Sequence, residues 1–321
     1  MFLSLGIRFE ANVEAMNMVE TTGNYSKHRR VPYIIESENL VKIIYVPAVS
    51  GESIAHAYQE LLAMEARAED QSVCTLCTRG EFLKSMDQVY AKEKFDGRDL
   101  PKEPEELEQG IVKKCTVEDV GGFLYAGKPP IKRTSAFQVS YALPIKNFAV
   151  YSMLEPQLHA RHAQLRDVEK REEGAAEQMI YYVEIGTAIY GFVFNLDLMA
   201  IGMSALTGKP VLSIDEIRSR RRAAIKSLAR MVSSGQFGAK LSRFFPLGGI
   251  RSLVLTATDK PFTVTSPIYE KYEETTLKRL EKISKEFSEE CKCYILGKDG
   301  LETPEDAFSK LISYLREKDI I

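Results

Sequence analysis

Alternating apolar and polar residues predict strands at several places along the chain. Residues 3–9 place Leu and aromatic side chains on one face and small or polar ones on the other, which is typical of a half-buried strand. Residues 40–46 and 137–141 have the same character. The clearest pattern covers residues 179–198, where two apolar stripes meet at Gly186. We expect two tightly joined strands there.

Two helix starts are marked by capping residues. Ser50 is suited to an N-cap, and Gly51 allows another backbone to come close, ahead of apolar residues at helical spacing. Such a start fits phosphate binding, although an ordinary capped helix needs no ligand. The run from Ser213 to Glu216 is a capping box that opens a helix to about Val232. Gly235 is expected to end it.

The order of these elements predicts an α+β fold. The order strand, helix, strand occurs twice in succession, as in the ferredoxin-like split βαβ fold. The open sheet of that fold is a common platform for single-stranded RNA. Residues 70–119 are acidic and helix-prone, and we expect an insertion there between the two parts of one sheet domain, 1–69 and 120–321. Residues 16–32 have little periodicity and are expected to form a long loop. Topology alone decides no function.

Composition is that of a folded protein, with 45% hydrophobic and 27% charged residues in 321. No apolar run approaches the roughly 18 residues of a membrane span, and the start does not resemble a signal peptide, so we expect a cytoplasmic protein without membrane contact. The net charge of −2 hides segregation: residues 218–251 hold nine Lys or Arg and no acid. Residues 120–154 and 21–35 also lack acids. Together these runs favour one positive face, although each alone fits a solvated surface.

Little in the sequence favours catalysis or a metal. Cys74 and Cys77 have the spacing of half a zinc site, but no second pair follows, so we expect helix-surface or core thiols and neither metal nor cofactor. Residues 122–128 begin like a P-loop, yet Pro129 replaces the Ser or Thr that magnesium needs. The pair His159 and His162 fits zinc or acid–base cleavage of RNA, but no positioned partner is visible. A binding protein is the favoured interpretation, not an enzyme.

Aromatic residues are interleaved with the basic runs, a combination suited to single-stranded nucleic acid because cations hold phosphates and rings stack on bases. The pattern places Tyr25 beside Lys27, Tyr125 before Lys128, and Phe237, Phe244 and Phe245 around Lys240 and Arg243. Phe244 and Phe245 fit a core equally well.

Four blocks extend this interpretation: residues 17–32 (NMVETTGNYSKHRRVP), 46–56 (VPAVSGESIAH), 119–135 (DVGGFLYAGKPPIKRTS) and 238–246 (GAKLSRFFP). In this order they resemble the DevR-type CRISPR-associated autoregulator family, and within it the archaeal type I-A Cascade backbone subunits. The resemblance implies a non-catalytic subunit that polymerises along CRISPR RNA (crRNA) and presents it for pairing with target DNA. It further implies contacts with other copies of the chain in a helical filament and with other Cascade subunits.

The resemblance also implies a palm built on a modified RNA-recognition motif (RRM), helical fingers at 70–119, and a thumb loop near 127–134 or 205–213. It implies these RNA-contacting residues: Asn17, Asn24, Lys27, His28, Arg29, Ser50, Gly51, His56, Lys132, Arg133, His159, Lys240 and Arg243. Two alternatives stay open. One is a metal-independent RNA endonuclease that uses His159. The other is a DNA-binding transcriptional autoregulator, for which the helix carrying Arg218 and Arg222 is the only candidate reader.

Overall fold

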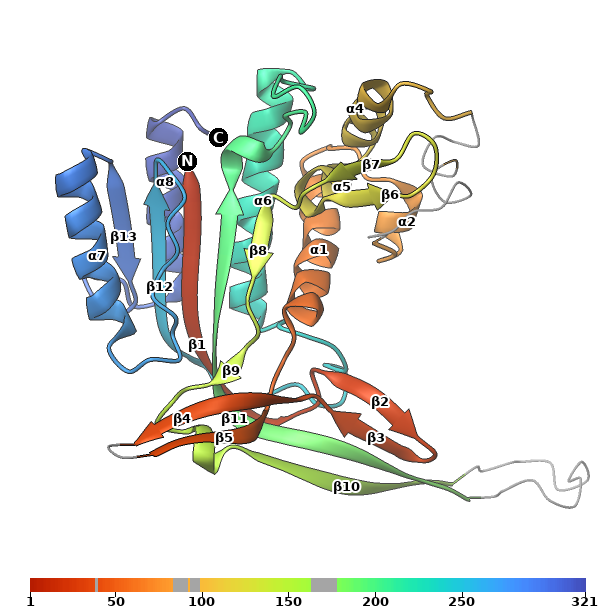
Figure 1. Cartoon of the computed structure of the whole chain (residues 1–321), viewed down its shortest axis with the longest axis vertical. Coiled ribbons are helices and arrows are strands. Elements are labelled where there is room, and N and C mark those ends of the chain that lie inside the picture. The colour runs from red at the N-terminus through yellow and green to blue at the C-terminus, as the bar shows by residue number, and fades with distance from the viewer. Residues whose placement is uncertain (38–39, 83–91, 93–98, 163–177) are drawn as a thin grey trace, which may run out of the picture.

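A computed structural model describes residues 1–37, 40–82, 92, 99–162 and 178–321, and shows an α+β chain built on a mixed sheet (Figure 1). The strands are β1 (Phe2–Glu14), β2 (Met18–Thr22), β3 (Tyr25–His28), β4 (Arg30–Ser37), β5 (Leu40–Pro47), β6 (Phe123–Tyr125), β7 (Ile131–Arg133), β8 (Phe137–Val139), β9 (Leu143–Pro144), β10 (Met153–His162), β11 (Gln178–Asp197), β12 (Ile250–Thr258) and β13 (Cys291–Ile295). The helices are α1 (Gly51–Ala68), α2 (Thr75–Thr78), α4 (Pro104–Lys114), α5 (Thr116–Gly121), α6 (Ile214–Ser234), α7 (Tyr272–Phe287) and α8 (Pro304–Glu317). Among the described residues, no helix combines the length and apolarity needed to cross a membrane.

The centre of the sheet is β1, which pairs antiparallel with β12 on one side and with β11 on the other. The end of β11 pairs antiparallel with β8, so four strands lie in the order β12, β1, β11, β8. Helix α1 lies between β1 and β8 in the chain, and α6 lies between β11 and β12. These two helices pack together over one face, where the hydroxyl of Tyr58 donates to the carbonyl of Ala224 at 3.1 Å.

Both faces of β1 are covered, although its sequence predicts a half-buried strand. Leu5 and its apolar neighbours on the same face join the core beneath α1, α6 and α8. On the other face, the amide of Val264 donates to the Ser4 hydroxyl at 3.1 Å. A Cβ on Gly6 would lie 2.9 Å from the Val264 side chain, so only glycine lets this segment approach.

Strand β11 is one continuous strand of 20 residues, and the prediction of two strands joined at Gly186 is wrong. At Gly186 the strand changes partners: its first half pairs with β10 and its second half with β1. A Cβ there would lie 2.4 Å from the carboxylate of Glu14, so the glycine makes room for a buried acid instead of ending the strand.

The expected long loop at residues 16–32 is also wrong. The segment forms the hairpin of β2 and β3, turned at Gly23 with φ +60°, and enters β4. Strand β3 adds to the sheet by pairing parallel with β11, while β4 and β5 form a separate ribbon. All of β2 beyond Met18 is exposed. Because no face of β2 is buried, its sequence needs no apolar alternation, which explains the missed strand.

Helix α6 follows its prediction closely. The side chain of Ser213 caps the amide of Glu216, and the Glu216 carboxylate accepts from the backbone of Ser213, so the capping box is confirmed. Gly235 ends the helix in the left-handed region, also as predicted. The chain that follows α6 returns toward the ribbons at the foot of the sheet (Figure 1).

Candidate nucleic-acid interface

A pocket of about 410 Å³ lies where the loop after α6 meets β3, β10 and β11. It is lined by Ser26, His159, Tyr181, Val183, Lys240, Ser242, Arg243 and Phe244, which we call the α6-loop pocket. Three residues of the predicted RNA-contacting set therefore meet at one place, although about 80 residues of chain separate His159 from Lys240.

The loop is fastened to the sheet by its backbone. Ala239 donates its amide to the carbonyl of Met16 at 3.1 Å. The neighbouring Gly238 lies so close that a Cβ would be 2.7 Å from the Met16 side chain. Lys240 has φ +55°, in the left-handed region that residues other than glycine seldom adopt. Because the backbone is fixed by these contacts, the direction of the Lys240 side chain is fixed as well.

His159 faces Tyr181 across the β10–β11 ladder, and their rings stack with centroids 5.2 Å apart. The ring of Phe244 meets the imidazole edge-on at 6.0 Å. The Nε2 atom of His159 is buried and has no hydrogen-bond partner among the described residues. A buried polar atom without a partner costs free energy, so this nitrogen is one that a ligand would satisfy.

The charge in the pocket is not cancelled by nearby acids. Within the described ranges, neither Lys240 nor Arg243 has an acidic side chain at ion-pair distance, and both side chains are exposed. Partial burial and the charge of Arg243 lower the pKa of Lys240. Such mutual repulsion is relieved when an anion binds between two cations.

The rest of the basic run 218–251 is largely paired with acids of the same chain, some buried and some at the surface, which corrects the expectation that it forms one positive face. The partners are Asp319 for Arg218, Asp119 for Arg220, Glu69 for Arg222 and Lys226, Glu65 for Arg230, and Glu10 for Arg251. Arg221 donates instead to the carbonyls of Leu198 and Ile320, at 2.8 and 3.3 Å. The uncompensated charge of this run is therefore concentrated in the α6-loop pocket.

Asn17, Arg29 and Ser50 meet beside this pocket. The Asn17 side-chain oxygen accepts from Arg29 Nε at 3.1 Å and from the Ser50 amide at 2.6 Å. The guanidinium of Arg29 also reaches the Tyr141 hydroxyl at 3.5 Å. Asn17 directly follows Met16, whose carbonyl holds the α6 loop, so the two sites are continuous. Asn17 is itself buried, and its hydrogen bond with Arg29 orients the guanidinium.

Ser50 and Gly51 have structural explanations at the start of α1. The Ser50 hydroxyl accepts from the Ser53 amide at 3.3 Å, as an N-cap does. A Cβ on Gly51 would lie 2.6 Å from the carbonyl oxygen of Val139, so the close approach of β8 leaves room only for glycine here. Both residues are buried, and the Ser50 amide is already bonded to Asn17.

Asn24 and Lys27 lie on the β2–β3 hairpin, whose Ser26 lines the pocket. The side-chain amide of Asn24 donates to the backbone carbonyl of Ile180 at 3.1 Å, which fixes the hairpin on β11. Lys27 is exposed and pairs with Glu20 at 3.6 Å. The ring of Tyr25 stacks on that of Tyr182 at 5.8 Å. This hairpin thus extends the edge of the pocket with one exposed cation.

His28 points into the interior and is not part of an accessible surface. Its Nε2 lies 2.8 Å from the Glu14 carboxylate, and both side chains are 0% exposed. Tyr190 donates to the same carboxylate at 2.7 Å. Burial opposes charge on both partners, yet their mutual hydrogen bond and attraction raise the pKa of His28 and lower the pKa of Glu14. His28 therefore stabilises the fold where β1, β3 and β11 meet.

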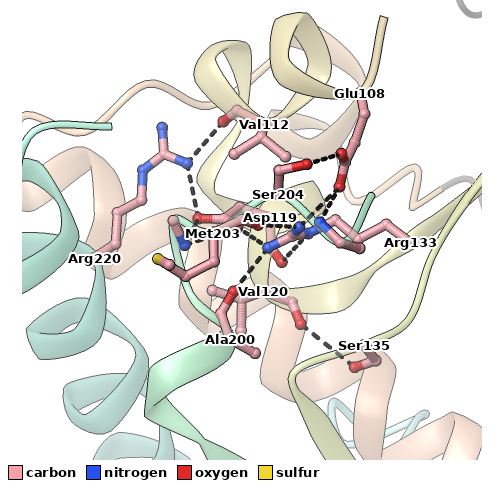
Figure 2. A network of polar contacts seen from close by, with 12 residues as sticks. Glu108, Val112, Asp119, Val120, Arg133, Ser135, Ala200, Met203, Ser204 and Arg220 are labelled. Carbon is pink, nitrogen blue, oxygen red and sulfur yellow. Dashed lines mark hydrogen bonds and ion pairs between the residues drawn. The ribbon is translucent and has the colours of Figure 1, made fainter. Parts of the chain in front are cut away.

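Arg133 is likewise committed to the interior (Figure 2). Its guanidinium contacts the Asp119 carboxylate at 2.5 Å and that of Glu108 at 3.3 Å, and only 3% of its side chain is exposed. Arg220 donates to the other Asp119 oxygen at 3.0 Å. Further bonds from Arg133 end on the carbonyls of Ala200 and Met203, at 2.9 and 2.6 Å. The expectation that Arg133 contacts RNA is therefore not supported, because its guanidinium bonds tie α4 and α5 to the segment after β11.

Lys132 lies away from the α6-loop pocket, and His56 does not line it. Lys132 is exposed on β7, beside α4 and α5, whereas the ribbons lie past the other end of α1 (Figure 1). His56 pairs with Glu60 one turn further along α1, at 3.3 Å. Among the aromatic candidates, Tyr125 and Phe237 are core residues, and Phe244 alone of the three Phe residues lines the pocket.

Sequence reasoning missed Ser26 and Tyr181, which complete the pocket. Ser26 lies inside the segment expected to be a loop, and Tyr181 was assigned only to an apolar stripe. The pairing of His159 with Tyr181 was predictable in principle, because two neighbouring antiparallel strands set His159 directly opposite it. That inference needs β10, which has no clear alternation: it contains Pro156, and most of its described residues are exposed.

Comparisons with known proteins agree with this architecture. Residues 5–277 match the family described as CRISPR-associated negative auto-regulator DevR/Csa2. The chain is 34% identical over 313 residues to the CRISPR-associated aCascade subunit Cas7/Csa2 2 of Saccharolobus solfataricus, covering 94% of each chain. It is 28% identical to the CRISPR-associated protein Cas7/Cst2/DevR of Methanocaldococcus jannaschii, covering 89% of this chain and 90% of the relative.

Among solved structures, a chain of a CRISPR RNA-guided surveillance complex in a pre-nicking state has a TM-score of 0.54. That match covers 98% of this chain and 100% of the other, at 11% identity, and so concerns the fold alone. The sequence matches extend over nearly the whole chain. The chain therefore belongs to the DevR/Csa2 family of CRISPR-associated proteins.

Proposed function

We propose that this protein is a non-catalytic backbone subunit of a type I CRISPR Cascade complex, and that it holds the crRNA along its sugar–phosphate backbone. The observation that carries the proposal is the α6-loop pocket, where two cations without an acidic partner among the described residues, a histidine nitrogen equally without a partner there, and two aromatic rings meet. The Saccharolobus relative, named as an aCascade subunit, supports the same assignment.

The chemistry of the pocket suits a single strand. Lys240 and Arg243 are placed to bind phosphate oxygens, and His159 Nε2 is placed to bond a phosphate or a 2′-hydroxyl. Tyr181 and Phe244 offer ring faces or edges to a base without selecting its identity. Arg29 extends the positive path beside the pocket, and Lys27, which pairs with Glu20, is a further exposed cation on the β2–β3 hairpin. Sequence specificity is then left to guide pairing with target DNA.

The proposed architecture follows the same reasoning. The order β12, β1, β11, β8, with α1 and α6 as the connecting helices, is that of a ferredoxin-like sheet, which supports an RRM-like palm built from 1–69 and 120–321. Residues 70–119 then form the fingers, of which 83–91 and 93–98 lie outside the described residues. Further copies of the chain and other Cascade subunits are the proposed protein partners.

A binding comparison tests this function. The purified chain is titrated with single-stranded RNA of mixed sequence, with the same sequences as duplex DNA, and at several salt concentrations. We expect binding to single-stranded RNA with little sequence preference and strong dependence on salt. Tighter binding to duplex DNA would contradict the proposal and favour the autoregulator hypothesis. The ion pairs of Arg218 and Arg222 oppose that hypothesis, because they occupy the side chains of the only candidate reading helix.

The unpartnered Nε2 of His159 also fits the endonuclease alternative. Acid–base catalysis needs a proton acceptor and a donor, and the described lining of the pocket contains no carboxylate. RNA incubated with the protein, with and without EDTA, distinguishes the two functions. We expect intact RNA. Cleavage that resists EDTA and disappears in His159→Ala would establish the endonuclease instead.

A further inference from the structure

Three cysteines meet inside the protein, far from the α6-loop pocket. The sulfur atoms of Cys74, Cys77 and Cys115 all lie within 4.8 Å of one another. Their exposed fractions are 4%, 1% and 0%, so the cluster is enclosed. The sequence offers only the pair Cys74 and Cys77 at metal-binding spacing, and the fold supplies the third sulfur from about 40 residues away.

Local backbone structure holds this cluster together. Cys74 precedes α2 and accepts a hydrogen bond at its sulfur from the Cys77 amide, at 3.5 Å. Cys115 lies between α4 and α5, so it is fixed by two helices at once. The amide of the next residue, Thr116, donates to the carbonyl of Ser72 at 2.9 Å, which clamps the two segments against each other. The backbone of these two segments therefore brings the three thiols together.

A buried carboxylate lies beside the cluster. The Glu118 carboxylate is 3.3 Å from the Cys77 sulfur, and the Glu118 residue is only 3% exposed. It lies on α5, three residues after Cys115; the group of ligand atoms within 4.8 Å of one another comprises the three sulfurs, so Glu118 reaches its centre by a rotation of its own side chain. Three sulfurs and a carboxylate oxygen together match the ligand types and the number that zinc takes in structural sites.

We propose that Cys74, Cys77, Cys115 and Glu118 bind one structural Zn²⁺ ion. Ligands about 2.3 Å from a tetrahedral zinc are themselves about 3.8 Å apart, so the sulfurs need to shift by less than about 1 Å. Thiolates select zinc over Mg²⁺ or Ca²⁺, which prefer oxygen ligands. Because protein groups fill all four positions and the cluster is buried, the ion has no open position for substrate and serves to fasten α2 to α5.

Metal content of the purified full-length chain tests the proposal. The chain is produced with zinc in the medium and purified without chelator, and its bound metal is measured by elemental analysis. Four protein ligands hold a single ion, so we expect about one zinc per chain. Cys77→Ser and Cys115→Ser should each lose the metal. Cys293→Ser, which removes a thiol from β13 on the other side of the sheet, is the matched control and should retain it.

A second measurement on the unmodified chain remains valid when a variant fails to fold. Titration with Co²⁺ reports thiolate coordination directly through intense sulfur-to-cobalt absorption, and added Zn²⁺ should displace the cobalt and abolish that absorption. The proposal is overturned when the wild-type chain holds no more zinc than its Cys115→Ser variant and gives no thiolate–cobalt absorption. A disulfide between any two of the three cysteines in the freshly purified protein would overturn it as well. None of these outcomes depends on RNA binding, so they test the zinc site independently of the proposed function.

Discussion

Removing the two uncompensated cations of the α6-loop pocket should change how RNA binding depends on salt. Each phosphate neutralised on a single strand contributes about −0.7 to the slope of log K against log salt concentration. If Lys240 and Arg243 each neutralise one phosphate, the variant Lys240→Ala/Arg243→Ala has a slope less steep by about 1.4. A fourfold rise in salt then reduces the affinity advantage of the wild type over the variant about sevenfold.

The assay is a set of equilibrium titrations of labelled single-stranded RNA at four or more salt concentrations, on the wild type and the variant. Lys278→Ala/Lys282→Ala is the matched control, because it removes the same charge from exposed positions on α7. The control should keep the wild-type slope. Equal slopes for wild type and pocket variant, or an equal change in the control, would refute the assignment of phosphate contacts to this pocket.

Further predictions concern the ring, the buried acid and the buried histidine. Phe244→Ala should weaken RNA binding by about 1–3 kcal/mol without altering the salt slope, because it removes stacking and no charge. Asp119→Ala should cost about 3–5 kcal/mol in urea unfolding, because it leaves two buried arginines without their shared carboxylate. Arg218→Ala, which breaks a pair between a partly exposed arginine and an exposed aspartate, should cost less than about 1 kcal/mol. The raised pKa of His28 means that its pairing stabilises the fold fully below its ordinary pKa of 6.5 and that this stabilisation is lost as pH rises through the folded-state pKa. The lowered pKa of Glu14 means that the stabilisation by this pair is also lost in acid, as pH falls from the ordinary Glu pKa of 4.5 through the folded-state pKa of Glu14. The unfolding free-energy difference between wild type and His28→Gln, measured by urea unfolding, should therefore be largest between pH 4.5 and 6.5 and shrink on either side. A difference that stays constant from pH 5 to about 9 would contradict the pairing.

Features fixed by neighbours in the chain were predictable from sequence. The capping box at Ser213 and the helix end at Gly235 depend on contacts within one helix, and both were found. Gly51 was also interpreted correctly, because close approach of another backbone is a common reason for glycine at a helix start. The approaching strand, β8, is nearly 90 residues further on and was not predictable from this position.

Features that depend on distant partners were not predictable. Arg133 lies in a stretch without acids, yet its partners Asp119 and Glu108 precede it by 14 and 25 residues. Local charge counting treats such a residue as exposed and positive, whereas the fold buries and pairs it. Arg222 and Arg230 of α6 are mispredicted in the same way, because their acidic partners Glu69 and Glu65, at the end of α1, lie more than 150 residues away.

The candidate site was predictable only in part for a related reason. The aromatic and basic composition of residues 237–245 favours this loop as a binding element, and the loop carries Lys240, Arg243 and Phe244 into the pocket. What the loop meets there is set by the pairing of β10 with β11, since that register puts His159 against Tyr181. The third sulfur of the cysteine cluster is likewise brought in by packing and has no signal in residue spacing.

The central claim is that RNA passes over the α6-loop pocket. Ultraviolet cross-linking of bound single-stranded RNA, followed by mass spectrometry of the attached peptides, tests it most directly. We predict cross-links to peptides that contain Tyr181 or Phe244, diminished in Lys240→Ala/Arg243→Ala. Cross-links confined to the β6–β7 region or to α7, with none on β3, β10, β11 or the loop after α6, would contradict the account.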